Sequence, residues 1–495
     1  MRASILSFFL AAAPALCTPA ANFDVTKETA ASYQCGDDCY SILQSTIADD
    51  RAVVGTDFDN DFYAVASNFS TAQPGDLLKL KPVDPETLTV ISGVSVYRIQ
   101  YVSEDLNGSH VPVTGYIALP FSLPESGAFP LVAFAHGTVG ANAGCAISNG
   151  PDLFDYHSWS LLSERGYALV GTDYVSPPPI PSLSNRNTNK SQAGLGTNST
   201  THKYCAFPAH AADLFHSVTA ARQAFGAVLS KQWLSVGHSQ GGGAVWKLAE
   251  DISHLASTHS NNNSSADNEA SNYLGTVALA PATKVVDMAH AAIANALATP
   301  DDVHAISAAS LLPLLVQAVQ RIYPSSFNAS SLLGPVLSAR MSLADAAQLC
   351  ASGVLGLTLD LDVEQLLGGI ASMTNSTAAL LSAWQDRMAP TNGAKAHGPV
   401  LVVQGVNDTA ILHETTVQAW EDACAAGGEV HLVLYPKQDH SGLLPAAAPD
   451  WLRWIDERFG GVETEGKCTR VTKEAFDYKY VKAEPEVDPD SNSVN

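Results

Sequence analysis

A glycine-flanked serine between a short apolar run and a helical stretch is the feature that most restricts how this chain folds. Residues 233–236 predict a buried strand, residues 242–250 predict a helix, and a Gly-His-Ser-Gln-Gly turn joins them at 237–241. A turn this sharp leaves no room for side chains at its two ends, so glycine flanks the serine. The pattern predicts a Ser239 hydroxyl exposed at the carboxyl edge of a sheet, beside a helix N-terminus.

The rest of the chain supplies the alternating strands and helices of a mostly parallel sheet. Residues 94–101 and 111–119 alternate apolar and polar positions around Asn107-Gly108, which predicts a hairpin. Further apolar runs predict buried strands at 130–135, 167–174, 274–280, 400–403 and 431–435, with helices near 154–165, 209–229 and 447–459.

The stretch between Ala280 and Val400 is too long for a sheet crossover and is dense in Leu and Ala. We expect residues 283–395 to form an inserted helical cap that acts as a substrate lid; the alternative is a structural domain without a part in chemistry. The core then comprises residues 91–282 and 396–468. A loop-like N-terminal arm at 21–90 precedes it, and an acidic tail at 469–495, expected to be disordered, follows it.

The composition excludes several classes of partner. With 46% hydrophobic and 15% charged residues among 495, the chain is globular and rich in core residues. It carries 26 basic and 49 acidic residues, a net charge of −23, so nucleic acid and anionic membrane surfaces would repel it. This balance is typical of a soluble protein in an acidic extracellular medium.

The N-terminus and the sequons indicate secretion. Residues 1–20 have a charged start, an apolar centre and small residues at the end, which predicts a signal peptide rather than a membrane anchor. We expect glycosylation at Asn-x-Ser/Thr sites, namely Asn68, Asn107, Asn189, Asn198, Asn262, Asn263, Asn328 and Asn375. Asn407 also fits the pattern, but we expect it to be too buried for modification.

The cysteine count is odd once the signal peptide is removed with Cys17. An odd count in a secreted chain implies one free thiol or an intermolecular bond. Cys35 and Cys39 resemble half of a metal knuckle, but no second close pair completes it, so a disulfide is the better interpretation.

The serine hydroxyl is a weak nucleophile and needs a base. With this kind of turn, the order along the chain is serine, then Asp or Glu, then His. Asp408 follows the strand at 400–403 and His440 follows the strand at 431–435, so both lie on loops at the carboxyl edge. We expect His440 to take the Ser239 proton and Asp408 to fix the imidazole tautomer.

Other histidines and acids are less suitable for these roles. His397 and His431 lie before or within strands and His413 begins a helix, so we expect structural roles for them. Asp439 adjoins His440 in the sequence and would point away from its ring.

An acyl-transfer site also needs two N–H groups directed at one point, the oxyanion hole. Gln240 supplies one from the turn after Ser239. The second is expected from the loop that follows the strand at 130–135, whose sequence is His-Gly-Thr-Val-Gly. We favour the backbone N–H of Thr138, with its hydroxyl as an additional donor; the alternative is a tight turn that only requires glycine.

A second group of residues looks like a metal-ligand set. His210, Asp213 and His216 follow one another at intervals of three, which carries the last residue far around a helix, so the three cannot share one face. We expect no metal. No phosphate-binding glycine loop is present either, so we expect no cofactor.

Together these motifs resemble the fungal-type secretory lipases of the lipase A kind, within the α/β-hydrolase superfamily. The resemblance covers about residues 90 to 468 and rests on 135–140 with Cys145, 171–174 and 237–242, with Asp408 and His440 in matching order. It implies an α/β-hydrolase with a mostly parallel sheet, helices on both faces and an inserted α-helical lid, acting on carboxylic esters. It also implies disulfides Cys145–Cys350 and Cys424–Cys468, whereas Cys35, Cys39 and Cys205 are additional to the pattern.

The leading hypothesis is a secreted serine hydrolase that forms an acyl-enzyme on Ser239, most simply a triacylglycerol lipase or carboxylesterase. We expect a lipid acyl chain in a pocket lined by the cap, a transient contact with a lipid interface, and a monomer. One alternative substrate is a soluble acetyl or aromatic ester. Another alternative is a hydrolase-fold binding protein, against which the complete Ser239, Asp408 and His440 set argues.

Overall fold

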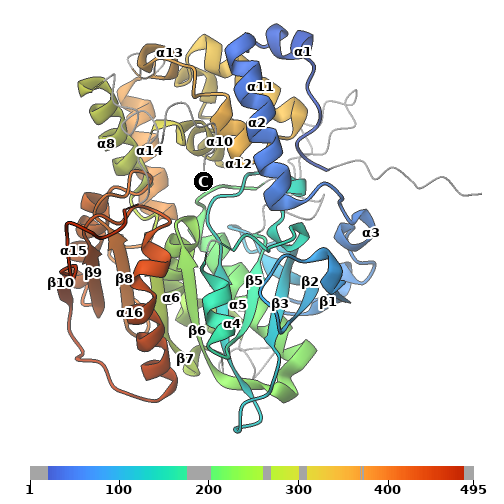
Figure 1. Ribbon diagram of the computed structural model, residues 1–495, viewed down its shortest axis with the longest axis vertical. Helices are drawn as coiled ribbons and strands as arrows, with labels where there is room; N and C mark the ends of the chain where they lie inside the picture. Colours follow the sequence, from blue (N-terminus) through green and yellow to red (C-terminus); the bar gives the residue numbers. More distant parts are fainter. Residues whose placement is uncertain are drawn as a thin grey trace, which may run out of the picture.

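One large mixed sheet forms the centre of the molecule (Figure 1). The computed structural model describes residues 20–155, 157–174, 202–259, 269–299, 309–367, 370 and 373–483. Within them, 10 strands are ordered β1-β2-β3-β5-β4-β6-β7-β8-β9-β10. The strands from β5 across to β10 are parallel, and β1, β2 and β3 are antiparallel. The strand bounds are β1 (Leu77–Pro82), β2 (Val94–Glu104), β3 (His110–Pro120), β4 (Phe129–Ala135), β5 (Ala168–Thr172), β6 (Leu229–His238), β7 (Tyr273–Leu279), β8 (Val400–Gly405), β9 (Val430–Tyr435) and β10 (Thr469–Thr472).

The central strands are apolar because both of their faces are covered. Every residue of β5 and β8 is buried, as parallel strands between helical layers require. In β9, by contrast, buried and half-buried residues alternate, and β10 at the sheet edge is mostly exposed. The predicted hairpin is confirmed as β2 and β3, and the predicted central strands are confirmed within a few residues of their ends.

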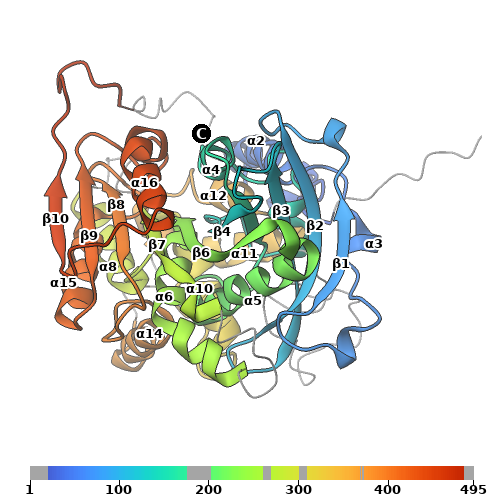
Figure 2. The ribbon, with the colours of Figure 1, turned by 90° about the horizontal axis from the view of Figure 1, so that it is seen from below.

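Helices cover both faces of the sheet, as Figure 2 shows. α5 and α6 pack on one face and α4 and α16 on the other. The predicted helix near 154–165 is shorter than expected, because α4 begins only at Trp159. The helix bounds of the core are α4 (Trp159–Glu164), α5 (Phe207–Phe225), α6 (Gln240–His259), α15 (His413–Ala425) and α16 (Leu443–Phe459).

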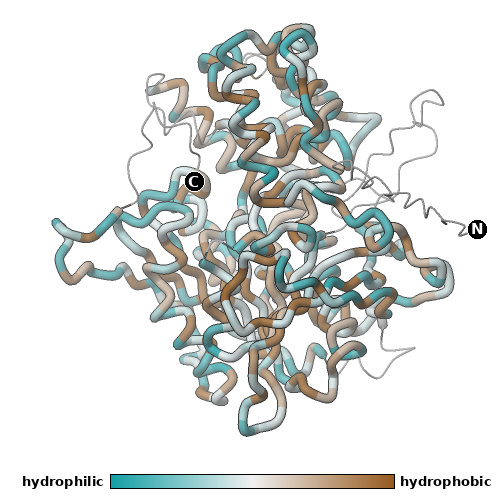
Figure 3. The backbone as a smooth tube through the Cα atoms, turned by 45° about the vertical axis from the view of Figure 1, so that its right-hand side comes forward, coloured by the Kyte–Doolittle hydropathy of each residue, from teal (hydrophilic) through white to brown (hydrophobic). Residues whose placement is uncertain are grey.

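A second group of helices lies above the sheet in Figure 1, beyond the carboxyl ends of its parallel strands. We call those that fall between β7 and β8 the inserted helices: α8 (Val285–Ala298), α10 (Leu312–Ile322), α11 (Pro335–Ala347), α12 (Ala351–Gly356), α13 (Val363–Leu367) and α14 (Asn375–Met388). Figure 3 shows hydrophobic segments running through the sheet layer and also through this upper group. Among the described residues, none of the helices combines the length and the apolarity that a membrane span requires.

The N-terminal arm is more structured than the sequence suggested. Its 21–90 range holds α1 (Lys27–Ser32), α2 (Asp37–Val54), α3 (Asn60–Tyr63) and β1, so the loop-like prediction is wrong. The polar residues that suggested loops lie on the outer face of α2, while its inner face packs on α12. Asp50 of α2 accepts hydrogen bonds from the backbone N–H groups of Ser352 and Gly353, both at 2.9 Å.

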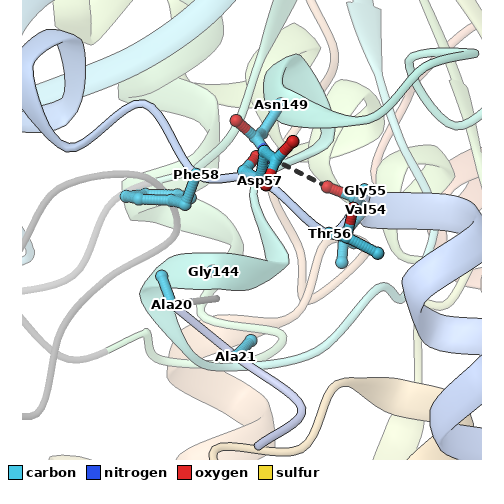
Figure 4. Close-up of a pocket in the computed structure, with 9 residues that line it drawn as sticks. All are labelled: Ala20, Ala21, Val54, Gly55, Thr56, Asp57, Phe58, Gly144 and Asn149. Carbon is cyan, nitrogen blue, oxygen red and sulfur yellow. Dashed lines mark hydrogen bonds between the residues drawn. The ribbon is translucent and has the colours of Figure 1, made fainter. Parts of the chain in front are cut away.

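The first described residues are also fixed in place. Figure 4 shows Ala20 and Ala21 running beside Gly144, in the loop region that follows β4. Asn22 then pairs with the inserted helices, because its side chain accepts a bond from the Cys350 N–H at 3.0 Å and its own N–H donates to Gln348 at 2.9 Å. Arg51 of α2 donates to the Asn22 carbonyl at 2.6 Å.

The C-terminal tail differs from its prediction as well. Residues 469–472, expected in a disordered tail, form β10, which pairs in parallel with β9. Cys468 explains this order, because its disulfide to Cys424 holds the chain against α15 immediately before the strand.

Candidate active site

Ser239 lies on the turn between β6 and α6, as the sequence predicted. Its φ of 58° falls in the left-handed region, which a residue with a side chain occupies only when its surroundings hold it there. Three backbone bonds do so: the Ser239 N–H donates to Leu279 at 2.9 Å, and its carbonyl accepts from Gly243 at 3.2 Å and from Ala282 at 2.9 Å.

The flanking glycines are required by close approach. A Cβ on Gly241 would lie 1.9 Å from the carbonyl oxygen of Ala135, and a Cβ on Gly237 would lie 2.2 Å from the carbonyl oxygen of Gly241. Any larger residue would therefore push β4 and the turn apart. The turn packs tightly enough to hold the strained serine.

Asp408 and His440 meet although 32 residues separate them, since their loops follow the neighbouring strands β8 and β9. The Asp408 Oδ2 lies 2.8 Å from the His440 Nδ1. The other oxygen, Oδ1, accepts from the N–H groups of Ala410 at 2.9 Å and Ile411 at 2.7 Å. The carboxylate is thus held with one oxygen directed at the imidazole.

Gln404 is a supporting residue that the sequence reasoning missed. Its Nε2 donates to Asp408 Oδ2 at 3.0 Å, and its Oε1 accepts from Thr416 at 2.9 Å, so its amide orientation is defined from both ends. The signal was a single polar residue at the end of the apolar strand β8, in a fully buried position.

His440 shows the electrostatics expected of a base. Burial opposes its charged form, but the charge of Asp408 and the hydrogen bond to it outweigh that effect and raise the pKa of His440 above its usual value. A positive imidazolium is therefore stabilised at the position where one forms when a serine proton is taken up.

His238 connects the two halves of the site. Its Nε2 donates to the backbone carbonyl of His440 at 3.0 Å, and the two rings lie 4.5 Å apart. Because His238 immediately precedes Ser239, this contact brings the His440 loop against the turn that carries the serine. Burial, together with the nearby His440, lowers the pKa of His238 well below its usual value, so His238 is neutral.

The residues predicted for the oxyanion hole border Ser239. Gln240 is the first residue of α6, so its backbone N–H is one of the N–H groups at the helix N-terminus that have no partner within the helix. Its side-chain amide points elsewhere and lies 3.5 Å from the Nε2 of His202. On the other side, a Cβ on Gly137 would lie 3.4 Å from the Cβ of Ser239. Thr138 follows directly, and its Oγ1 lies 2.9 Å from the hydroxyl of Tyr204.

A disulfide joins the Thr138 loop to the inserted helices. Cys145 bonds Cys350 across 205 residues, and the Ala351 N–H donates to the Val139 carbonyl at 3.1 Å. The second disulfide implied by the resemblance, Cys424–Cys468, is also present. Cys35 pairs with Cys39, as expected, and Cys205 is a buried free thiol.

An apolar pocket opens in front of Ser239. It is bordered by α8 through Val285, Met288 and Ala289, and by α10 through Leu312 and Leu315. Ala410 and Ile411, whose N–H groups hold Asp408, close another side. The pocket therefore lies between the candidate nucleophile and the inserted helices.

The rival residues have other partners. Asp439 accepts a bond from the Gly442 N–H at 2.7 Å. His431 bonds Thr469 at 2.9 Å, His397 lies 3.1 Å from the Ser253 hydroxyl, and His413 is the first residue of α15.

The residues that resembled a metal-ligand set are engaged separately. His210 stacks on Tyr174 with ring centroids 4.4 Å apart, and His216 lies 3.4 Å from Glu104. In the part of the chain that the structure describes, His, Cys, Asp and Glu side chains form no group of three suited to a metal ion.

The sequons are exposed where they are described, at Asn68, Asn107, Asn328 and Asn375. Asn189, Asn198, Asn262 and Asn263 lie outside the described residues. The expectation that Asn407 is buried is wrong: the chain turns outward after β8, and Asn407 is exposed one residue before the buried Asp408.

The mostly parallel sheet, covered on both faces and carrying a strained serine after β6, defines the α/β-hydrolase fold. Comparison with solved structures identifies its lipase A-like form. The closed state of Candida antarctica lipase A matches with a TM-score of 0.58 over 84% of this chain and 90% of that chain, at 14% identity. The ligand-bound rice cell wall degrading esterase LipA from Xanthomonas oryzae matches with a TM-score of 0.52 over 79% of this chain and 97% of that chain, at 16% identity. No protein-family model and no curated protein sequence matches the chain.

Proposed function

We propose that this chain is a secreted serine hydrolase of carboxylic esters, with Ser239 as nucleophile, His440 as general base and Asp408 as the acid that orients it. The observation that carries the proposal is the 2.8 Å contact between His440 Nδ1 and Asp408 Oδ2, on a loop that His238 ties to the Ser239 turn. The fold shared with a lipase and an esterase supports the same class of reaction.

The proposed reaction begins with a neutral His440 and an ionised Asp408. The Ser239 Oγ attacks the ester carbonyl carbon while the His440 Nε2 takes the hydroxyl proton, and Asp408 stabilises the resulting imidazolium. The tetrahedral intermediate carries its negative charge on the former carbonyl oxygen, where the N–H groups of Gln240 and Thr138 would bind it. Collapse breaks the bond to the alcohol, which leaves with the proton from His440. Water, activated by the same base, then releases the acid from Ser239.

The pocket favours an apolar acyl group. Its walls are aliphatic side chains of α8 and α10, which would bury acyl methylene groups at a gain of about 0.8 kcal/mol for each. A lipid ester is therefore the preferred substrate, with a transient contact at a lipid interface. A soluble acetyl ester would leave most of this surface unused.

We further propose that the inserted helices act as a lid and that the protein is secreted. The lid proposal rests on their position over the pocket and on the Cys145–Cys350 link to the Thr138 loop. Secretion is supported by the disulfides, which persist in oxidising compartments, and by the exposed sequons.

The function is tested with Ser239→Ala, assayed on p-nitrophenyl esters from acetate to palmitate. Loss of a triad member costs on the order of 10⁶-fold in kcat, with the fold preserved. Ser230→Ala, at a half-buried position near the start of the same strand and at its end away from Ser239, is the matched control and should keep full activity. Retained hydrolysis in purified Ser239→Ala would place the nucleophile elsewhere, and inactivity of the wild type on every ester would favour the binding-protein alternative.

A further inference from the structure

The pocket in front of Ser239 is lined by one polar side chain to which the proposed mechanism gives no role. Among the described residues that line it, only Ser239 and Tyr204 carry a polar group, and the other side chains are aliphatic or methionine. Tyr204 is 8% exposed. A hydroxyl in such a wall costs free energy unless it forms hydrogen bonds, so the partners of this hydroxyl determine what it can do.

The Tyr204 hydroxyl bonds the residue whose backbone N–H is the second donor proposed for the oxyanion hole. It is 2.9 Å from the Oγ1 of Thr138. Thr138 follows Gly137, where a Cβ would touch the Cβ of Ser239 at 3.4 Å. The Tyr204–Thr138 pair therefore lies near the nucleophile, on the side of the loop that the proposed mechanism assigns to the ester carbonyl oxygen.

The backbone around Tyr204 is anchored from other elements. Arg321 of α10 donates to the His202 carbonyl at 2.7 Å. The Lys203 ammonium lies 3.5 Å from Asp105, at the end of the β2–β3 hairpin. These contacts fix the chain just before Tyr204, and the Thr138 and Cys205 side chains hold the phenol itself, as a group that acts on a transition state must be held.

The two hydroxyls form one hydrogen bond with each other, and the hydroxyl that accepts this bond keeps its own proton for another acceptor. If the Thr138 O–H donates to the Tyr204 oxygen, the Tyr204 proton is left to donate elsewhere. Tyr204, not Thr138, lines the pocket. The Cys205 side chain also hydrogen-bonds the phenol, but a thiol sulfur is a weak acceptor, so an ester oxygen that becomes negative would be the better partner for this second proton. Burial also raises the pKa of Tyr204 well above its usual value, which keeps the phenol protonated over the working pH range.

We propose that the Tyr204 hydroxyl is a third oxyanion donor, which binds the ester oxygen as it becomes negative, and that the Thr138 side chain positions it. The proposal rests on the proposed function of Ser239. It adds a side-chain donor to the two backbone N–H groups of Thr138 and Gln240. The hydrogen bond from Tyr204 should be strongest in the tetrahedral intermediate, because a hydrogen bond to a charged oxygen is stronger than one to a neutral carbonyl.

The test is Tyr204→Phe, which keeps the ring and removes only the hydroxyl. We expect kcat to fall on the order of 10- to 100-fold with KM nearly unchanged. Thr138→Val should cost less, because the phenol remains but loses its orientation, and Thr138→Ser should restore the activity. The double variant Tyr204→Phe with Thr138→Val should be no slower than Tyr204→Phe alone.

An inhibitor pair separates oxyanion binding from packing. A decyl trifluoromethyl ketone forms a charged tetrahedral adduct with a serine, whereas decyl methyl ketone binds mainly through its alkyl chain. Tyr204→Phe should raise the inhibition constant of the trifluoromethyl ketone by the same factor by which kcat falls. The inhibition constant of the methyl ketone should stay unchanged. Tyr273→Phe is the matched control, because Tyr273 is a buried tyrosine whose hydroxyl bonds Ser235 at 2.7 Å, outside the pocket.

The outcomes distinguish this proposal from the function on which it rests. If Tyr204→Phe keeps the wild-type kcat while Ser239→Ala is inactive, the third-donor proposal fails and the hydrolase proposal stands. Equal weakening of both ketones would assign Tyr204 to packing and also overturn the proposal. Activity that survives Ser239→Ala would reject the proposed function itself.

Discussion

The Nε2 of His238 donates a hydrogen bond to the backbone carbonyl of His440 at 3.0 Å, so the residue before the candidate nucleophile holds the loop of the candidate base. The two loops come from β6 and β9, which are separated in the sheet by β7 and β8. Neighbouring strand pairing alone does not bring them together. This side chain spans the distance, and its neutrality avoids a second positive charge beside the imidazolium.

Substituting His238 should therefore affect turnover more than stability. His238→Phe removes the donor while keeping a ring, and we expect kcat to fall about tenfold as the His440 loop loses its alignment. His238→Gln, which can place an amide N–H near the same point, should recover part of the loss. The measurement is kcat and KM for both variants beside their melting temperatures. A drop in melting temperature without a change in kcat would contradict the positioning role.

Asp408→Asn should reduce kcat by roughly 10⁴-fold, because the amide can hold the imidazole in the wrong tautomer. Asp439→Asn is the comparison, since the Asp439 carboxylate accepts a bond from the Gly442 N–H and acts on His440 through its charge without bonding the ring, so its loss should cost far less. Full activity of the Asp408 variant, measured after active-site titration with a phosphonate, would show that another group fills its role.

The pH profile reports on the same pair. Because Asp408 raises the pKa of His440, activity should be lost as the pH falls through a value above the usual histidine pKa of about 6.5. Below that point His440 is protonated and cannot take the serine proton. In Asp408→Asn, the pH at which half of the residual activity is lost on acidification should be lower than in the wild type. A profile of kcat/KM from pH 5 to 9 measures the midpoint in both proteins. An unchanged midpoint would mean that the loss of activity at low pH is not due to protonation of His440.

Asp50 should make the stability of the protein depend on pH. Burial raises its pKa to about 7, although the Gly353 and Ser352 N–H groups oppose part of the rise. Folding therefore takes up a proton between about pH 4, the usual value, and pH 7. The protonated Asp50 therefore adds to the free energy of unfolding below this pH window, and this stabilisation is lost as the pH rises through the window.

Urea unfolding at pH 5 and pH 8 tests this linkage. We expect the wild type to lose about 1–3 kcal/mol more than Asp50→Asn between the two values. Asp38→Asn, an exposed carboxylate on the same helix, should behave like the wild type. Equal pH slopes in all three proteins would rule out the Asp50 contribution.

The Cys145–Cys350 disulfide should stabilise the protein more than Cys35–Cys39 does. The first closes 205 residues and the second only 4, so loop-closure entropy favours the long bridge by about 3 kcal/mol. Replacing both cysteines of each pair with serine, followed by thermal unfolding under non-reducing conditions, measures the difference. Similar losses for the two pairs would mean that local packing, rather than chain entropy, sets their contributions.

The sequence by itself determined the elements whose signals are local. The glycines around Ser239 encode a turn that only small residues permit, and the apolar runs encode strands buried on both faces. The order of Ser239, Asp408 and His440 after three such strands then followed from the shared edge of parallel strands. The Asn107-Gly108 hairpin was equally local.

Only the tertiary structure decided which distant segments meet. The buried face of α2 recurs at helical spacing but includes the polar Thr46 and Asp50, whose burial depends on the contact with α12. β10 is short, mostly exposed and held by a disulfide. His238 and Tyr204 act through contacts across 202 and 66 residues, which nothing in their neighbouring residues encodes. The contacts of Gln404 with Asp408 and Thr416 are local, and its polar side chain in the buried strand β8 was a signal in the sequence. A local pattern specifies the conformation of a segment, whereas its partner depends on how all the apolar surfaces are buried together.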